Sequence, residues 1–424
     1  MIDVAAIGPR VWPAADRPVP LERGRRAIAT TAVAVAMLPL TVPRGPANLG
    51  PIDALIAISL LACLFWAGTS GQRWHFPYAI SMTLFLAAGA LGALFGPVPE
   101  AGALAIVQDI FLLAWCWAVM NIGRSSLTLR LLLKTWAYSS IVWAGLLFVG
   151  LAVSATFLTG HSAQEGSRTA LTFFNPNVSA NYYFISIMII WASGCPRRRG
   201  FRFAAYGLLV AALISSGSNS GIVSVIVGVA VAAGLGAYRR GGAAPALTVL
   251  ALFLLGSYFF ASTVSVSEIQ DKASASRYTF LREGIGRGAG SVSERTTLLH
   301  ESIPLFKRGG LLGQGPASTK PRLQEEMAPL VKEAHDDYLA ALLERGIAGL
   351  AAVLLLLVTI GARAMSVTTR RLGQSFAVAV IRPNALVGAF AGTVVAGTAI
   401  ESLHLRHVWV LFALIAAVYT WDRD

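Results

Sequence analysis

His335 is the residue in this sequence best placed for acid–base chemistry. It is followed by Asp336 and Asp337 and stands at the entry to an apolar run of membrane-spanning length. On a helix, His335 and Tyr338 would lie on one face above apolar residues. An unperturbed histidine has a pKa of about 6.5, which suits a general base near neutral pH. We therefore take His335 as a candidate catalytic residue and Tyr338 as a candidate substrate contact. The alternative is a histidine that only caps the helix or reaches the membrane interface.

The candidates for anion binding are arginines, because a guanidinium group binds phosphate through a two-pronged fork. They are Arg168, Arg295, Arg345 and Arg406. Arg168 precedes the sequence N-P-N, whose asparagines Asn175 and Asn177 are further candidates, and the polar turn S-G-S-N-S contributes Asn219. The alternative for any single arginine is a solvated loop charge.

Asp109 lies in the middle of an apolar run, where an ionisable residue indicates function by default. Arg382 is its candidate partner, either in a structural pair or along a proton path; the alternative is that Pro383 places Arg382 at the inner membrane interface. The sequence predicts no metal site and no cofactor, because the D-x-D at 422–424 sits in a terminal tail and no metal-ligand spacing occurs. A nucleotide-binding G-x-x-x-x-G-K-[ST] is also lacking.

The composition is that of a membrane protein. Of the 424 residues, 55% are hydrophobic and only 13% are charged, against roughly 25% charged in soluble domains. The formal charge of +13 comes from arginines clustered between apolar runs, and not from a basic stripe, so nucleic acid is excluded as a partner.

The apolar runs predict an all-α, polytopic membrane helix bundle. A bilayer core of about 30 Å needs about 20 apolar helical residues. About twelve runs meet this rule: 27–42, 51–68, 76–96, 101–121, 135–158, 178–194, 203–217, 220–238, 244–263, 338–361, 376–399 and 405–421.

Lysine and arginine gather in alternate loops, which predicts the orientation by the positive-inside rule. Both termini are expected in the cytoplasm, and the short outer loops hold only Arg44, Arg168 and Arg406. The expected organisation is a cytoplasmic tail (1–26), nine spans (27–263), an outer loop with amphipathic helices (264–337), and three spans with a short cytoplasmic tail (338–424). Four polar stretches then share the outer face: 161–177, 216–220, 264–337 and 401–407.

Taken together, these motifs resemble the O-antigen ligase/polymerase family of bacterial membrane proteins. The run H-D-D-Y-L at 335–339 with Glu344, Gly346 and Gly349 is similar to the family signature H-[N/D]-x-Y-L followed by E-x-G-x-x-G. Three features agree in order: N-P-N after Arg168, the polar turn at 216–221, and Arg295 upstream of G-Q-G-P. The resemblance covers roughly residues 165–350.

The resemblance implies a metal-independent glycosyltransferase of the bacterial inner membrane whose active site faces the periplasm. The donor would be a glycan linked to undecaprenyl diphosphate, and the acceptor another glycan or a lipid A core sugar. Inner-membrane lipids and a chain-length regulator would be further partners. His335 would deprotonate or orient the acceptor hydroxyl, and Arg295 with Arg168 would hold the diphosphate.

One departure from the family favours a polymerase of O-antigen or exopolysaccharide. Ligases of the family often have arginine in the polar turn, where this chain has Asn219. The alternatives are an O-antigen ligase of lipopolysaccharide biosynthesis and, from another class, a transporter that couples through Asp109 and Arg382. A non-catalytic assembly subunit is a third alternative.

Overall fold

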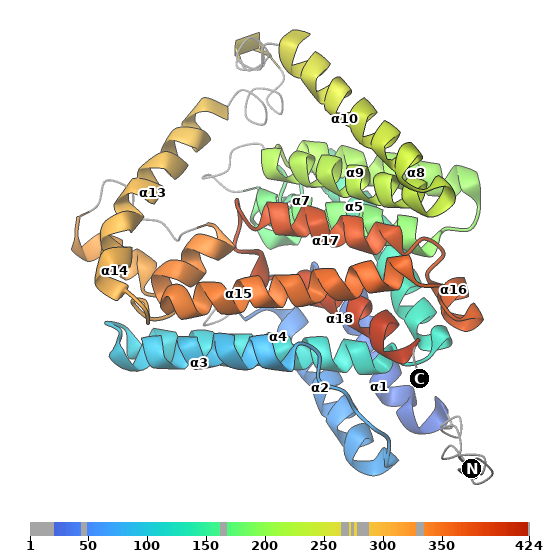
Figure 1. Ribbon diagram of the computed structural model, residues 1–424, viewed down its shortest axis with the longest axis horizontal. Helices are drawn as coiled ribbons and strands as arrows, with labels where there is room; N and C mark the ends of the chain where they lie inside the picture. The colour runs from blue at the N-terminus through green and yellow to red at the C-terminus, as the bar shows by residue number, and fades with distance from the viewer. Residues whose placement is uncertain are drawn as a thin grey trace, which may run out of the picture.

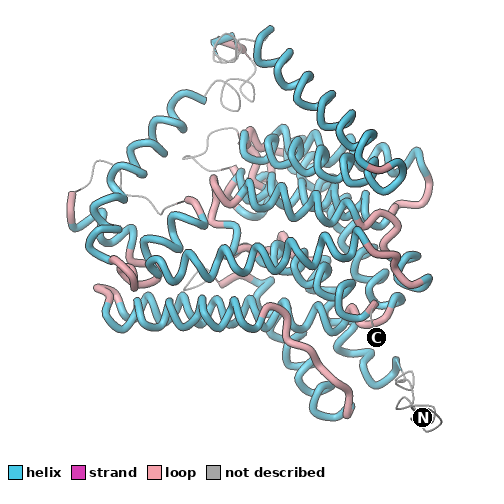
Figure 2. Tube along the Cα trace, in the orientation of Figure 1, coloured by secondary structure: helices cyan, strands magenta, loops and turns pink. Residues whose placement is uncertain are grey.

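The computed structural model describes residues 21–43, 49–161, 168–263, 271–272, 275–277, 288–327 and 335–422. The side chains of 21–23, 257–263 and 288–296 are not described. Within the described ranges every regular element is a helix, as the sequence predicts (Figure 2).

The predicted apolar runs coincide with helices. The first part of the chain forms α1 (Leu21–Ala36), α2 (Pro51–Ser70), α3 (Ala79–Phe95), α4 (Pro99–Ile122), α5 (Ser126–Ala152), α6 (Thr156–Thr159), η2 (Leu171–Phe173), α7 (Pro176–Ser193), α8 (Arg199–Ser215), α9 (Asn219–Gly241) and α10 (Ala243–Thr263). The second part forms α13 (Gly288–Gly309), α14 (Thr319–Glu325), α15 (Asp337–Thr369), α16 (Gln374–Ala379), α17 (Asn384–Ala396), η3 (Ser402–His404) and α18 (Arg406–Trp421). The predicted run 376–399 is divided between α16 and α17, next to Pro383, which has no N–H for helical bonding.

Among the described residues, 5 helices are long and apolar enough to cross a membrane: α2, α4, α5, α9 and α15. Shorter apolar helices cover Ala79–Phe95, Ala243–Gly256, Asn384–Ala396 and Arg406–Trp421. Large apolar side chains such as Phe65, Ile80 and Phe95 are exposed, which a lipid environment accommodates. The protein is therefore an integral membrane protein, and the full count of about twelve spans stays a prediction.

The centre of the bundle is formed by α7 and α18. Nearly every residue of both helices is buried, as expected of helices that are apolar on all sides. Around them, α3, α15, α17 and α9 lie side by side, whereas α10 and α13 are inclined away from this stack (Figure 1). Gly228 of α9 and Gly388 of α17 permit the close approach of these two helices, because a Cβ on Gly388 would lie 2.3 Å from the Gly228 carbonyl oxygen.

The 33-residue helix α15 is interrupted at Gly346, whose φ of 65° and ψ of −164° are not helical. The interruption frees the carbonyls of Leu343 and Glu344, which accept hydrogen bonds from the N–H groups of Gln314 (2.8 Å) and Gly315 (2.9 Å). The turn between α13 and α14 is thereby docked on α15 by its backbone. Leu298, Leu305, Leu323 and Leu343 pack together in the same place.

The segment predicted to form the outer loop contains two described helices, α13 and α14. Ser318 immediately precedes α14, but its hydroxyl donates to the Gly315 carbonyl (2.5 Å) and does not cap the helix. In the sequence, Leu323, Met327, Leu330 and Val331 recur at helical spacing, but Leu330 and Val331 lie outside the described residues.

The two ends of the bundle differ in composition. The N-termini of α7, α9 and α15 lie at one end, near α13 and α14, and we call this the motif end (Figure 1). Arg124, Arg239 and Arg370 follow or end helices that run to the opposite end. The sequence-based orientation places the motif end in the periplasm.

Candidate active site

Arg168 joins two polar loops at the motif end. Its Nε donates to the carbonyl of Ser216 (2.9 Å), and its Nη2 donates to Oδ1 of Asn177 (3.2 Å). The same Asn177 oxygen accepts a hydrogen bond from Oγ of Ser218 (2.8 Å). The predicted polar stretches 161–177 and 216–220 are therefore in contact. We call Arg168, Asn177, Ser216 and Ser218 the Arg168 cluster.

Two helix N-termini begin at the Arg168 cluster. Asn175 caps α7, because its Oδ1 accepts the N–H groups of Asn177 (3.0 Å) and Val178 (3.3 Å), and Pro176 fills the first helical position. Ser218 caps α9 through the N–H of Gly221 (3.2 Å). A helix N-terminus carries partial positive charge, so these termini together with Arg168 favour an anion at this place.

The two other predicted asparagines have different surroundings here. The Asn175 side-chain oxygen is used in capping α7. Asn219 is exposed in the first turn of α9, next to the capping Ser218. Of the two, only Asn219 presents its carboxamide at the surface beside the Arg168 cluster.

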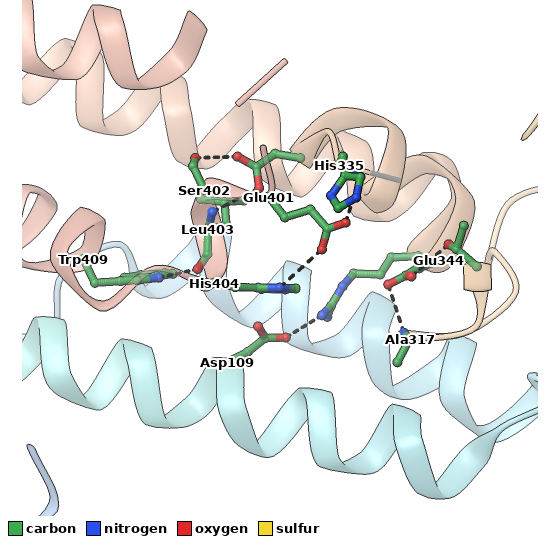
Figure 3. Close-up of polar contacts among 12 residues, drawn as sticks. Asp109, Ala317, His335, Glu344, Glu401, Ser402, Leu403, His404 and Trp409 are labelled. Carbon is green, nitrogen blue, oxygen red and sulfur yellow. Dashed lines mark hydrogen bonds and ion pairs between the residues drawn. The ribbon is translucent and has the colours of Figure 1, made fainter. Parts of the chain in front are cut away.

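His335 is exposed on the loop that enters α15 and faces Glu401 (Figure 3). Its backbone N–H donates to Oε1 of Glu401 (3.1 Å), and Oε2 of the same carboxylate lies 3.5 Å from Nδ1 of His404. The φ of His335 is 51°, in the left-handed region that residues other than glycine rarely adopt. Such conformations concentrate at functional sites. We call His335, Glu401 and His404 the His335 cluster.

The residues after His335 fix the backbone around it. Asp336 caps α15 through the N–H groups of Tyr338 (2.8 Å) and Leu339 (2.9 Å). Asp337 is buried, and its carboxylate accepts hydrogen bonds from Oγ of Ser402 (2.5 Å) and the N–H of Leu403 (3.0 Å). Asp337 thus binds α15 to the segment that carries Glu401.

Tyr338, the predicted substrate contact, is half-buried and donates its hydroxyl to the Val394 carbonyl (2.8 Å). With Asp337 it lines a small cavity whose other walls include Thr393, Ser402 and Phe412. In this arrangement Tyr338 ties α15 to α17, and its ring lies at the cavity beside the His335 cluster.

Arg345, another predicted substrate contact, is buried beneath the motif end. Its Nη2 lies 2.5 Å from Oδ2 of Asp109, and the two side chains are 4% and 5% exposed. The guanidinium carbon also lies 3.8 Å from the ring centroid of Phe85. The expected pairing of Asp109 with Arg382 is wrong, because the Asp109 carboxylate forms its ion pair with Arg345. Arg345 binds α3 and α4 instead of facing the outer surface.

The neighbouring residue Glu344 binds the start of α14. Its Oε2 accepts the N–H of Ala317 (3.0 Å), and its Oε1 accepts the hydroxyl of Thr319 (2.9 Å) (Figure 3). Together with the backbone hydrogen bonds of the turn 313–316 to α15, this contact holds α14 against α15. Arg295 belongs to α13, and its side chain lies outside the described residues.

One buried polar contact connects α7, which begins at the Arg168 cluster, with α18, which begins just after the His335 cluster. Nε2 of His407 lies 2.9 Å from Oδ1 of Asn181. Asn181 follows Asn177 by one helical turn on the same face of α7, and His407 follows closely after His404 in the chain. Arg406, an arginine predicted for phosphate binding, instead holds both carboxylate oxygens of Asp53 (2.9 and 2.8 Å).

Part of the chain matches a known protein family. A family model described as O-antigen ligase matches residues 204–354. This region belongs to the O-antigen ligase family. A search of curated protein sequences gave no match.

The O-antigen ligase region runs from α8 into α15, so it includes Asn219, Arg295, His335 and the docked turn 313–316. Arg168, Asn177 and Glu401 lie outside the matched residues, and the fold brings them to the same end of the bundle. Both candidate clusters therefore combine residues of the ligase region with residues from the segments that flank it.

The residues missed from the sequence are Ser218, Glu401 and His404. The sequence placed both of their stretches at the outer face but gave no reason to select these side chains. In the described part of the chain, no group of three or more His, Cys, Asp or Glu is arranged to hold a metal ion.

Proposed function

We propose that this protein is a membrane glycosyltransferase that takes a glycan from undecaprenyl diphosphate and transfers it to a sugar acceptor at the periplasmic face of the bacterial inner membrane. The observation that carries the proposal is the meeting of Arg168 with the N-termini of α7 and α9 at the end of the bundle that also bears His335. Arg168 and the two helix N-termini suit the binding of a diphosphate, and His335 suits an acceptor hydroxyl that must lose a proton.

In the proposed reaction, the acceptor hydroxyl oxygen attacks the anomeric carbon of the donor glycan. The bond between that carbon and the diphosphate oxygen breaks, and undecaprenyl diphosphate departs with the electron pair. His335 accepts the hydroxyl proton. Attack opposite the leaving group inverts the anomeric centre.

Arg168 is proposed to stabilise the negative charge that grows on the diphosphate during this step. Its fork is pre-oriented by Ser216 and Asn177, so little side-chain freedom is lost when the anion binds. Asn177 and Asn219 would add neutral hydrogen bonds, and Arg295 is proposed to bind the diphosphate as well. We propose that these residues stabilise the negative charge of the departing diphosphate without a metal ion.

Within this class we favour a polymerase of O-antigen or exopolysaccharide. Asn219 stands at the exposed start of α9, where an amide can donate a hydrogen bond but cannot neutralise a phosphate. The alternative is an O-antigen ligase that acts on the lipid A core. The transporter alternative loses its proposed coupling pair, because Asp109 binds Arg345.

The test is a transfer assay in nanodiscs with undecaprenyl-diphosphate oligosaccharide, with and without a lipid A core acceptor. A ladder of lengthening lipid-linked glycan would support a polymerase, and a single shift of the core acceptor a ligase. No product with folded protein and intact donor would contradict the transferase proposal.

A further inference from the structure

Glu401 lies between two histidines at the motif end, and each of its carboxylate oxygens is directed at one of them. Oε1 accepts the backbone N–H of His335 (3.1 Å), and Oε2 lies 3.5 Å from Nδ1 of His404 (Figure 3). We propose that Glu401 is the positioning residue for His335, and that His404 holds the Glu401 carboxylate in place. The inference rests on the proposed glycosyl transfer, because it gives His335 the role of proton acceptor.

The backbone of His335 needs such a contact. Its φ of 51° is unfavourable for a residue with a Cβ, so the surrounding groups must hold it there. On one side, Glu401 binds the N–H of His335. On the other side, the N–H of Asp337 donates to the Gly397 carbonyl (2.8 Å), and Asp336 caps α15. His335 is therefore held between Glu401 and the start of α15.

The segment that carries Glu401 is itself rigidly bound. Asp337 accepts hydrogen bonds from Ser402 and Leu403, the two residues that follow Glu401. Nε1 of Trp409 donates to the Leu403 carbonyl (2.6 Å) from the buried face of α18. The Glu401 side chain is only 18% exposed beside Nδ1 of His404. Because these contacts fix the segment that carries Glu401, Glu401 can hold the backbone of His335 in a fixed place relative to α15 and α18.

This role predicts how two substitutions at one position will differ. A glutamine keeps an oxygen that can accept the His335 N–H, whereas an alanine removes it. Glu401→Ala should lower kcat on the order of 10- to 100-fold, as expected when a reacting group is displaced by about 1 Å. The donor KM should change less than about twofold, because Glu401 binds His335 and not the Arg168 cluster. Glu401→Gln should keep most of the activity.

The kinetic experiment compares wild type, Glu401→Ala, Glu401→Gln and His404→Gln in nanodiscs, using undecaprenyl-diphosphate oligosaccharide as donor. Glu100→Ala is the matched control, since Glu100 is an exposed carboxylate in the first turn of α4. His404→Gln should cause a smaller loss of kcat than Glu401→Ala. Wild-type kcat in Glu401→Ala would overturn the proposal. So would equal losses in Glu401→Ala and Glu401→Gln, because the carboxylate would then act by its charge or take the proton itself.

A second readout does not depend on catalysis. Labelling with ¹⁵N-histidine gives at most 6 backbone amide signals, and His335→Asn identifies the signal of His335. A hydrogen bond to Glu401 predicts that this signal moves in Glu401→Ala, moves less in Glu401→Gln, and stays in Glu100→Ala. An unmoved His335 signal in Glu401→Ala would overturn the contact. If the signal moves as expected but the wild type transfers no glycan, the proposed function fails while the positioning contact stands.

Discussion

Asp109 and Arg345 form a buried ion pair across 236 positions of the sequence, with 2.5 Å between carboxylate and guanidinium. Arg345 directly precedes the interruption of α15 at Gly346, and Asp109 lies within α4. The pair therefore fastens the broken part of α15 to its neighbours, directly beneath the segment that presents His335. Its role in the fold is to hold the motif end in place.

Removing one partner of this pair should be strongly destabilising. Asp109→Ala leaves the Arg345 guanidinium buried without a counter-charge, at a cost of about 3–5 kcal/mol. The measurement is the thermal unfolding midpoint of the purified protein in detergent. Glu100→Ala, in the exposed first turn of the same helix, should unfold within a few degrees of wild type. Replacing both partners with leucine and methionine should recover much of the loss, and an unchanged midpoint in Asp109→Ala would show that the pair contributes little.

His335 should be tested with asparagine as well as alanine. Asparagine tolerates the left-handed backbone at φ 51°, so His335→Asn should unfold like wild type while losing the proton acceptor. Transfer should fall on the order of 10²- to 10⁴-fold. Alanine should lose similar activity and also about 1–2 kcal/mol of stability. His300→Asn, at an exposed position of α13, is the control, and full activity in His335→Asn would remove His335 from the mechanism.

Arg168→Lys should weaken donor binding even though the positive charge remains. A lysine cannot bind Ser216 and Asn177 with a planar fork while also contacting a diphosphate. We expect the donor KM to rise on the order of 10- to 100-fold, the effect of losing hydrogen bonds to a charged group. Arg371→Ala, at an exposed site near the opposite end of the bundle, should leave it unchanged. An unaltered donor KM in Arg168→Lys would place the diphosphate elsewhere.

Gly346→Ala should release the turn between α13 and α14 from α15. A Cβ at this position would lie 2.1 Å from the Leu311 carbonyl oxygen, and the φ of 65° disfavours any side chain. We expect a loss of about 1–3 kcal/mol and faster proteolysis near residues 310–318. The control is Gly145→Ala in α5, where a Cβ would meet nothing within 4 Å. Equal proteolysis of the two variants would show that the docking does not depend on Gly346.

Local features of this fold could be predicted from the sequence. The helix ranges follow from the lengths of apolar runs, and the start of α7 follows from Asn175 and Pro176, which cap and open the helix that they precede. The polar stretches that meet at Arg168 were placed on one face by charge bias alone. The capping contacts that decide the start of α7 lie within a few residues of one another.

The partners of individual charges could not be predicted, because they depend on helix packing. Arg345 sits in a motif that resembles a ligand-binding signature, yet its guanidinium is directed inward to Asp109. Glu401 approaches His335 only because Asp337 binds the residues that follow Glu401. Sequence spacing carries no information about such contacts.

The length of α15 has a consequence for how a bulky substrate reaches the protein. At about 1.5 Å per residue, the part of α15 that follows the interruption at Gly346 extends about 35 Å, enough to cross a hydrocarbon core of about 30 Å by itself. If this part spans the core, the short part before Gly346 and His335 lie outside the hydrocarbon. A hydrophilic sugar chain could then stay in water through every round of transfer, while its polyprenyl tail never leaves the bilayer.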